Sequence, residues 1–309
     1  MKIIFMGTPD FAVPSLEILL KNNYTISAVV TAPDKPRGRG QQVSVTPVKE
    51  FALKHSIPVL TPENLRDPQF ISALKNLTPD LFVIVAFRIL PREVYTIPTK
   101  GSFNLHASLL PKYRGAAPIN WAIINGEKES GVTTFFLQDK VDTGSVILQQ
   151  HIPISNEMNA GELHDALSEI GANAVLETVR LIESGKANPH EQNNALALPA
   201  PKIFKETCRI NWNQSSEVIH NFIRGLSPYP AAWTVYNDKQ IKIFRTKNSE
   251  VRSQKSEYKA GAIVAGEKII VHTSDGSIEI VELQQEGKKR MGSEEFLRGF
   301  HFDKNAKFI

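Results

Sequence analysis

The chain has 309 residues, of which 41% are hydrophobic and 22% are charged. These values are typical of a globular protein and exclude a disordered or fibrous one. The longest uncharged apolar run, residues 81–87, is too short to cross a bilayer, and the first residues lack a secretory cleavage pattern. Cys208 is the single cysteine, which excludes an internal disulfide and a cysteine metal cluster. We therefore expect a cytoplasmic protein of two domains without membrane association.

The strand and helix patterns alternate over the first two thirds of the chain. Apolar, β-branched runs predict strands at 2–7, 25–32, 80–87, 101–108, 131–137 and 144–154. Helical periodicity predicts helices at 8–23, 48–55, 68–77 and 160–186. Such alternation indicates βαβ units, and fully apolar strands indicate a sheet that is buried on both faces. We therefore predict an α/β, Rossmann-like domain with a mostly parallel sheet over residues 1–185.

A basic segment follows the second predicted strand. Lys35, Arg37 and Arg39 alternate there with Gly and Pro, a composition suited to contact with phosphates. An ordinary exposed surface loop explains the same residues equally well.

Candidate catalytic residues lie at the end of the strand at 101–108. Asn104 and His106 are two residues apart, so they share one face of that strand. Buried polar groups cost free energy unless something pairs with them, and sites form at the carboxyl ends of parallel strands. Asp142 belongs to a turn that should reach the same edge, where its carboxylate would orient the imidazole and favour its protonated form. The "DTG" at 142–144 could also be only a turn.

An amide, an imidazole and a carboxylate without a Ser or Cys nucleophile indicate transfer between two bound substrates. Amide and imidazole N–H groups can stabilise an oxyanion as a carbonyl is attacked, and the imidazole can also move protons. Acyl transfer to an incoming amine needs these groups and little else. No spacing of His, Asp or Glu suits a metal, and residues 6–12 do not match a dinucleotide-binding fingerprint. We therefore expect neither a metal nor a nicotinamide cofactor.

The pattern changes after Gly185. Residues 186–206 are rich in Pro and Asn without a clear period, and they predict a linker. One amphipathic helix follows at 215–226, and short strands are predicted at 231–237, 240–247, 261–273 and 277–285. Short strands in this number with one helix predict a small C-terminal β-barrel domain, OB-like, over residues 207–309.

The charge differs between the two predicted domains, although the formal net charge is only +4. Residues 1–201 contain 18 Lys and Arg against 19 Asp and Glu, whereas residues 202–309 contain 18 against 13. A basic domain attached to a neutral one favours a polyanionic partner, nucleic acid first. A basic surface that serves solubility explains the surplus almost as well.

Five segments together resemble one family: "GTPDFA", "PDKPRGRG", "NLHASLLPKYRGAAPI", "DTG" and "IRGLSPYPAAWT". Spread over essentially the whole chain, they resemble the methionyl-tRNA formyltransferase family in order and spacing. The Asn-His-SLLP and Asp-Gly elements alone are shared with glycinamide ribonucleotide formyltransferases, formyltetrahydrofolate hydrolases and dehydrogenases, and sugar-amine formyltransferases. The "GRG" of the basic segment, "GKKRM" at 287–291 and the basic C-terminal domain favour the tRNA enzymes.

The resemblance implies a role for each candidate residue. Asn104, His106 and Asp142 would transfer a formyl group to the α-amino group of methionine on initiator tRNA. The donor would be 10-formyltetrahydrofolate, in a pocket lined by Ser108, Leu109, Leu110, Pro111, Arg88, Ile89 and Leu90. The tRNA would be held through the basic segment and the C-terminal region, by Lys35, Arg37, Arg39, Lys202 and Lys205. We expect the protein to be a monomer.

Three alternatives stay open at this point. A sugar-amine formyltransferase shares the trio but does not need the basic segment. A non-catalytic RNA-binding module explains the charge and the barrel, yet leaves the trio without a purpose. A folate hydrolase needs no polyanion-binding domain. The segment Ala86-Phe87-Arg88 also departs from the Gly-containing family pattern, which bears on the lining of the folate pocket.

Overall fold

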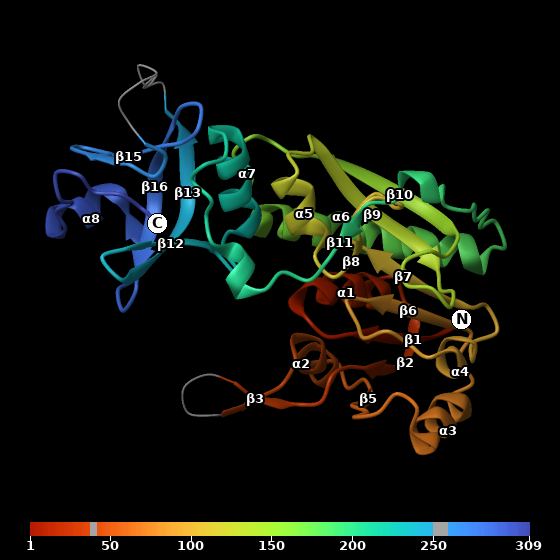
Figure 1. The fold of residues 1–309 in the computed structure, drawn as a ribbon. Helices are drawn as coiled ribbons and strands as arrows, with labels where there is room; N and C mark the ends of the chain where they lie inside the picture. The colour runs from red at the N-terminus through yellow and green to blue at the C-terminus, as the bar shows by residue number, and fades with distance from the viewer. Residues whose placement is uncertain (38–41, 250–258) are drawn as a thin grey trace. The chain divides into compact units, whose positions relative to one another are not determined.

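The computed structural model describes residues 1–37, 42–249 and 259–309, which pack into two compact units (Figure 1). The N-terminal unit contains residues 1–115, 130–152 and 164–200, and the C-terminal unit contains 116–129, 153–163 and 201–309. Within the described ranges, no helix combines the length and the apolar character that crossing a membrane requires.

The N-terminal unit is built on a seven-stranded sheet in the order β10-β9-β7-β6-β1-β2-β5. The pairings β5–β2, β2–β1, β1–β6 and β6–β7 are parallel, whereas β7–β9 is antiparallel. The mostly parallel, Rossmann-like sheet is therefore confirmed. Its strands are β1 (Lys2–Gly7), β2 (Thr25–Val30), β5 (Val59–Leu60), β6 (Leu81–Val85), β7 (Ser102–His106), β9 (Glu129–Phe136) and β10 (Val146–Pro153).

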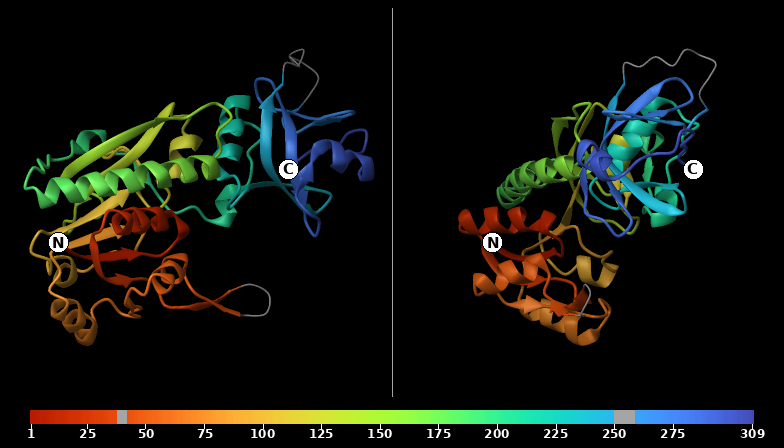
Figure 2. Two further views of the ribbon diagram at one scale, coloured as in Figure 1. Left: turned by 180° about the vertical axis from the view of Figure 1, so that it is seen from behind. Right: turned by 90° about the vertical axis from the view of Figure 1, so that its left-hand side faces the viewer.

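Helices cover both faces of this sheet. They are α1 (Val13–Lys21), α2 (Pro47–Lys54), α3 (Pro68–Asn76), α4 (Arg92–Tyr95) and α6 (Ala160–Glu183), with a 3₁₀ turn η1 (Asp10–Ala12) before α1. The long helix α6 runs along the same face as α1, as the left panel of Figure 2 shows, and Thr178 of α6 hydrogen-bonds to Thr134 of β9 at 2.7 Å. On the opposite face, residues of α3 and α4 share a hydrophobic cluster with β1 and β6.

Side chains alternate along β7, so Asn104 and His106 point to the face of the sheet that α3 and α4 cover. Leu105 points toward α6, where its side chain packs so closely against Gly171 that a Cβ there would lie 2.8 Å away. Asn104 and His106 therefore point the other way. Asn104 is paired in register with Ile84, a member of the α3 and α4 cluster. The sequence pattern thus delivers both polar side chains to one face, at the carboxyl end of a buried strand.

A β-hairpin occupies the basic segment that the sequence presents as a loop. Strands β3 (Lys35–Arg37) and β4 (Gln42–Ser44) pair antiparallel, and they include Lys35 and Arg37. The chain before β3 and the chain after β4 are joined by a hydrogen bond of 2.8 Å between the hydroxyl groups of Thr31 and Thr46. Arg39 lies outside the described residues.

The C-terminal unit contains a curled, antiparallel sheet in the order β12-β13-β16-β15-β14, with β17 also paired to β16. The register shifts twice between Ile243 and Thr246, and such irregularities increase strand bending. The predicted small β-domain is thereby confirmed, as a half-barrel. Its strands are β12 (Ala232–Tyr236), β13 (Lys239–Asn248), β14 (Ile263–Ala265), β15 (Ile269–His272), β16 (Ser277–Gln285) and β17 (Met291–Gly292).

Helices α5 (Pro118–Ile124), α7 (Ser216–Leu226) and α8 (Ser293–Gly299) also belong to the C-terminal unit. The side chain of Ser215 caps α7 by accepting from the Val218 N–H, as its position before the amphipathic stretch indicates. The buried Arg224 of α7 donates to the carbonyl oxygens of Ser155 and Met158, at 3.2 and 2.8 Å. The segment 153–163 is thus held within this unit by hydrogen bonds to α7.

Candidate active site

His106 ends strand β7 and is almost fully buried. Its Nε2 atom lies 2.8 Å from the carbonyl oxygen of Tyr113. Because a carbonyl oxygen only accepts, Nε2 carries a hydrogen and donates it. The other ring nitrogen, Nδ1, is therefore the one that is left to exchange a proton or to donate to a substrate.

Asp142 lies in the loop between β9 and β10 and faces His106. Its Oδ2 atom is 3.9 Å from Nδ1 of His106, and the same oxygen accepts a hydrogen bond of 3.0 Å from the Gly115 N–H. The separation of 3.9 Å exceeds a hydrogen bond, and a polar gap of this width suits one bridging atom. Asp142 adopts a φ of 55°, in the left-handed region that few residues other than glycine occupy. The structure thus brings together the imidazole and the carboxylate that the sequence singles out.

Asn104 is half-buried near the end of β7. Its side-chain amide makes no hydrogen bond to any residue of the described ranges. The alternation of β7 places it on the His106 face, so both amide hydrogens are available to an oxygen on that face.

The loop that follows β7 is fixed by two neighbouring strands. Thr133 of β9 donates its hydroxyl to the Ser108 carbonyl at 2.7 Å and accepts from the Leu110 N–H at 3.0 Å. Gln149 of β10 donates to the Leu110 carbonyl at 2.9 Å. The Ser108 hydroxyl is bound to the Lys112 carbonyl at 2.6 Å. Ser108 and Leu110 are buried, whereas Leu109 and Pro111 are partly exposed.

At two positions near the site, the backbone of a neighbouring segment lies so close that only glycine fits. A Cβ at Gly144 would lie 1.6 Å from the Phe136 carbonyl oxygen, which allows no side chain. Gly115 has a φ of 124°, and a Cβ there would lie 2.6 Å from the Ala200 carbonyl oxygen. The glycine of the "DTG" segment thus lets the loop of Asp142 return against β9.

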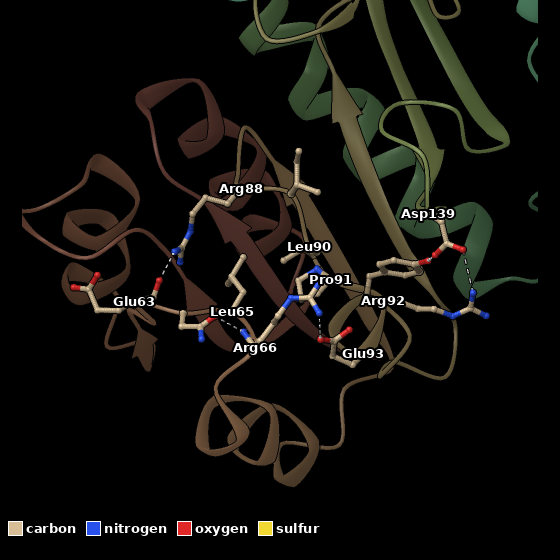
Figure 3. Close-up of a pocket in the computed structure, with 12 residues that line it drawn as sticks. Glu63, Leu65, Arg66, Arg88, Leu90, Pro91, Arg92, Glu93 and Asp139 are labelled. Atoms are coloured by element: carbon tan, nitrogen blue, oxygen red, sulfur yellow. Dashed lines mark hydrogen bonds and ion pairs between the residues drawn. The ribbon is translucent and has the colours of Figure 1, made fainter.

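A pocket of about 790 Å³ lies beside the chain that follows β6 (Figure 3). Leu65 and Leu90 supply buried apolar surface. Three arginines and three carboxylates also line the pocket, and Arg66 pairs with Glu93 as Arg92 pairs with Asp139. Ile89 also lines the pocket and is exposed. The three residues predicted at 88–90 therefore lie in one pocket, whose lining consists of Glu63, Asn64, Leu65, Arg66, Arg88, Ile89, Leu90, Pro91, Arg92, Glu93, Tyr95 and Asp139.

Two side chains of this pocket have a perturbed pKa. Burial lowers the pKa of the Arg88 guanidinium, which donates to the carbonyl oxygens of Pro62 at 2.7 Å and Glu63 at 3.1 Å. The hydrogen bond of 2.5 Å from the Tyr95 hydroxyl to Asp139, followed by burial, raises the pKa of Tyr95. Asp139 is also paired with Arg92 at 3.1 Å, so the loop that carries Asp142 is attached to α4.

The two basic residues predicted for tRNA contact at the end of the predicted linker are exposed, and they belong to the C-terminal unit. The Lys202 ammonium lies 5.5 Å from the centre of the exposed Phe204 ring. Lys205 begins a 3₁₀ turn, η3 (Lys205–Cys208), and its carbonyl oxygen accepts from the Trp233 indole at 2.8 Å. Their side chains therefore face solvent, where a phosphate can approach.

Several residues of the site escape sequence reasoning. Arg114 and Gly115 form a short strand, β8 (Arg114–Gly115), that pairs with β11 (Pro199–Ala200) from the predicted linker. Gln192 of the same predicted linker donates to the Asp142 carbonyl. The contacts of these residues join segments far apart in the chain, so no local sequence pattern predicts them. Among the described residues, no group of three or more His, Cys, Asp and Glu side chains is arranged to hold a metal ion.

Solved structures share this fold. An N-formyltransferase of Helicobacter canadensis, solved in complex with folinic acid and dTDP-3-aminofucose, is 25% identical, with a TM-score of 0.68 over 91% of this chain and 98% of that one. The methionyl-tRNA formyltransferase of Clostridium thermocellum is 17% identical, with a TM-score of 0.57 over 82% of this chain and 95% of that one. At 17% identity, the second likeness shows the fold alone.

Sequence comparisons reach further than the fold. Residues 1–179 match the formyl transferase family model, and residues 202–301 match the formyl transferase C-terminal domain. The methionyl-tRNA formyltransferase of Flavobacterium johnsoniae is 49% identical over 99% of this chain and 98% of its own length. That of Bacteroides fragilis is 48% identical over 97% and 95%, respectively. The chain belongs to the methionyl-tRNA formyltransferase family.

Proposed function

We propose that the carboxyl end of β7 transfers a formyl group from 10-formyltetrahydrofolate to the α-amino group of methionine on initiator tRNA. The observation that carries the proposal is the pair of buried His106 and partly buried Asp142, 3.9 Å apart. On the same face of β7, the Asn104 amide has no hydrogen bond to the described residues. An amide donor, a proton-exchanging imidazole and an orienting carboxylate suffice for acyl transfer to an amine.

The three residues have separate tasks in this proposal. The folate donor supplies the formyl group. Asn104 donates an N–H to the formyl oxygen, where negative charge gathers as the amine attacks. His106 acts through Nδ1, because its Nε2 hydrogen is held by the Tyr113 carbonyl. Asp142 faces that nitrogen across 3.9 Å, where its negative charge would stabilise a proton on the ring.

The pocket beside β6 suits a folate. A folate combines flat rings, of which the pterin carries hydrogen-bonding groups, with an anionic tail. The pocket combines buried leucines with three arginines and three carboxylates. Backbone groups at Arg88, Ile89 and Leu90 would hold the ring system. The fixed loop at 108–111 does not line this pocket, and we assign it to the side of the donor that faces His106. The guanidinium groups of Arg66 and Arg92, both largely exposed, would attract the tail.

The acceptor is a polyanion, and basic residues are assigned to it. Lys202 and Lys205 are exposed, and the chain from residue 202 onward has the basic surplus. Lys35 and Arg37 belong to the β3–β4 hairpin, and we assign Arg39 to the same contact with tRNA. Basic side chains on phosphates fix the position of a nucleic acid without reading its sequence.

The proposal also keeps a division of labour along the chain. Residues 1–185 would carry the chemistry, residues 207–309 would hold the tRNA, and residues 186–206 would connect them. We propose that the protein works in the cytoplasm as a monomer. Light scattering of the purified protein tests the last point, since a dimer would double the measured mass.

The direct test is an assay with 10-formyltetrahydrofolate and methionine-charged initiator tRNA. Nucleotide-linked amino sugars, glycinamide ribonucleotide and water are offered as competing acceptors in parallel reactions. We expect formylation of the charged tRNA alone. Formylation of an amino sugar alone would overturn the acceptor while leaving the chemistry of His106 and Asp142 in place. Donor hydrolysis without any formylated product would overturn the transferase itself.

A further inference from the structure

The segment 190–200, which we call the strap, runs along the loop that carries Asp142. His190 and Val146 exchange two backbone hydrogen bonds, at 2.8 and 2.9 Å. Ten residues later the strap ends in β11, which pairs with β8. It includes the 3₁₀ turn η2 (Asn194–Leu196). Although the strap follows α6 in a segment without periodicity, it is hydrogen-bonded to both sides of the active-site edge.

Gln192 of the strap uses every hydrogen-bonding position of its side-chain amide. Its Nε2 donates to the carbonyl oxygens of Asp142 at 3.0 Å and Gly144 at 2.8 Å. Its Oε1 accepts from Nε and Nη2 of Arg114, at 3.1 and 2.6 Å. An amide has two donor hydrogens and two acceptor lone pairs, so all four are satisfied. Arg114 is held in turn by Asn194, whose Oδ1 lies 2.8 Å from Nη2.

These contacts fix the backbone from which the catalytic carboxylate projects. Asp142 has a φ of 55°, a conformation that persists only when its surroundings hold it. Gln192 holds its carbonyl group, and the Gly115 N–H, next to Arg114 in sequence, holds its Oδ2 atom. The same short segment supplies the Tyr113 carbonyl that orients His106. His106 and Asp142 are therefore both hydrogen-bonded to the segment 113–115. Gln192 links that segment to the loop of Asp142.

We propose that Gln192 is a positioning residue for formyl transfer, which acts by holding Asp142 toward Nδ1 of His106 while Arg114 holds Gln192. This inference rests on the proposed catalytic role of Asp142. If Gln192 only tied the strap to the sheet, its replacement would lower the stability of the fold and leave kcat unchanged. A positioning group affects the chemical step, because misplacing a catalytic group by about 1 Å can cost about 100-fold in rate.

The primary variant is Gln192→Met, which keeps the length of the side chain and removes all four hydrogen bonds. Its matched control is Gln150→Met in β10. Among the described residues, the Gln150 side chain makes a single long hydrogen bond, to Glu177 at 3.3 Å. We expect Gln192→Met to lower kcat by about 10- to 100-fold, with the KM values of donor and acceptor within about twofold of wild type. The control should retain wild-type kcat. Equal kcat in the two variants would overturn the proposal.

A second variant, Gln192→Glu, tests the proposal even if Gln192→Met does not fold. Gln192→Glu keeps acceptors for Arg114 but has no donor for the carbonyl oxygens of Asp142 and Gly144. We expect it to stay folded through its ion pair with Arg114, at an unfolding temperature below that of the wild type, and to show the same loss of kcat. A Gln192→Glu protein with wild-type kcat would exclude a positioning role, whatever the stability of Gln192→Met.

A double-mutant cycle with Asp142→Asn separates the two hypotheses. If Gln192 acts through Asp142, adding Gln192→Met to Asp142→Asn costs less than about twofold in kcat, whereas independent defects would multiply. Multiplied defects would overturn the positioning role. If Asp142→Asn alone keeps near-normal turnover, the catalytic assignment of Asp142 is wrong and this inference falls with it. If Asp142→Asn is impaired and Gln192→Met is not, only the positioning role is wrong.

Discussion

His106 and Asp142 face each other through one pair of atoms, Nδ1 and Oδ2, separated by 3.9 Å. The opposite side of the imidazole is already engaged, because Nε2 donates to the Tyr113 carbonyl oxygen. The Nε2 atom thus fixes the ring, and Nδ1 is the nitrogen to which we assign the chemistry. A protein that needs one nitrogen for proton exchange gains accuracy by fixing the ring through the other one.

Replacing Asn104 by Ala should remove a donor to the formyl oxygen. Loss of one such donor lowers kcat by about 10²–10³-fold. Folding should be unaffected, because the amide makes no hydrogen bond to the described residues. Single-turnover kinetics at saturating donor and acceptor measure the effect, with Asn173→Ala on α6 as the control. Near-normal turnover of Asn104→Ala would remove Asn104 from the catalytic group.

Asp142→Asn keeps an oxygen for the Gly115 N–H but loses the charge that faces His106. We expect a fall in kcat of about 10²–10⁴-fold, the range of general acid–base contributions. Binding of the donor should change little, and fluorescence titration with a folate analogue measures it. Asp165→Asn, an exposed carboxylate on α6, serves as the control. A fall in donor affinity without a fall in kcat would assign Asp142 to folate binding instead.

The exposed lysines near the start of the C-terminal unit should contribute to the salt dependence of acceptor binding. Each phosphate contact contributes a slope of about −0.9 to a plot of log affinity against log salt concentration on duplex nucleic acid. Lys202→Ala and Lys205→Ala should each make the slope shallower by about one. Lys54→Ala, whose ammonium is paired with Glu50 on the surface, should leave it unchanged. Unaltered slopes in both C-terminal variants would mean that the tRNA binds elsewhere.

Gly144→Ala should disrupt the loop of Asp142 without unfolding the sheet. The added Cβ would lie 1.6 Å from the Phe136 carbonyl oxygen, so the loop must move away from β9. Because the carboxylate moves with it, we expect a loss of kcat of about 100-fold or more. Thermal unfolding and turnover are measured together, with Gly266→Ala, where a Cβ meets nothing within 4 Å, as the control.

Acidification should weaken the C-terminal unit through His272. This residue is 3% exposed on β15, and burial holds the pKa of its imidazole below the ordinary value of 6.5. The unfolded chain therefore binds more protons than the folded one between the two pKa values, so stability falls as pH drops below 6.5.

Amide hydrogen exchange of β15 between about pH 7 and pH 5 follows this loss. Each rate is corrected for the intrinsic pH dependence of exchange. His272→Gln should show a weaker dependence on pH than the wild type, and the exposed His301→Gln should show the wild-type dependence. Identical profiles for wild type and His272→Gln would exclude His272 as the titrating group.

The strands and the first half of the site follow from local sequence. Asn104 and His106 share a face because strand side chains alternate, and an apolar strand end marks the edge where sites form. The pairing of His106 with Asp142 depends on the path of a loop, which no local pattern determines. The role of Gln192 is harder still to predict, because it lies in a segment without helical or strand periodicity and its partners at 142–144 are far away in the sequence. The β3–β4 hairpin was missed because its Gly and Pro content favours a loop.

If Gln192 positions Asp142 as we propose, a working catalytic fragment has to include the strap at 190–200. A fragment truncated after Glu183 would keep all seven strands of the N-terminal sheet, since β10 ends at Pro153 and α6 at Glu183. It would lack Gln192 and β11, so the proposed positioning role of Gln192 predicts poor turnover by such a fragment. Extension to Ala200 restores those contacts. The contacts that hold the loop of Asp142 are therefore completed only by residues that follow α6, up to Ala200.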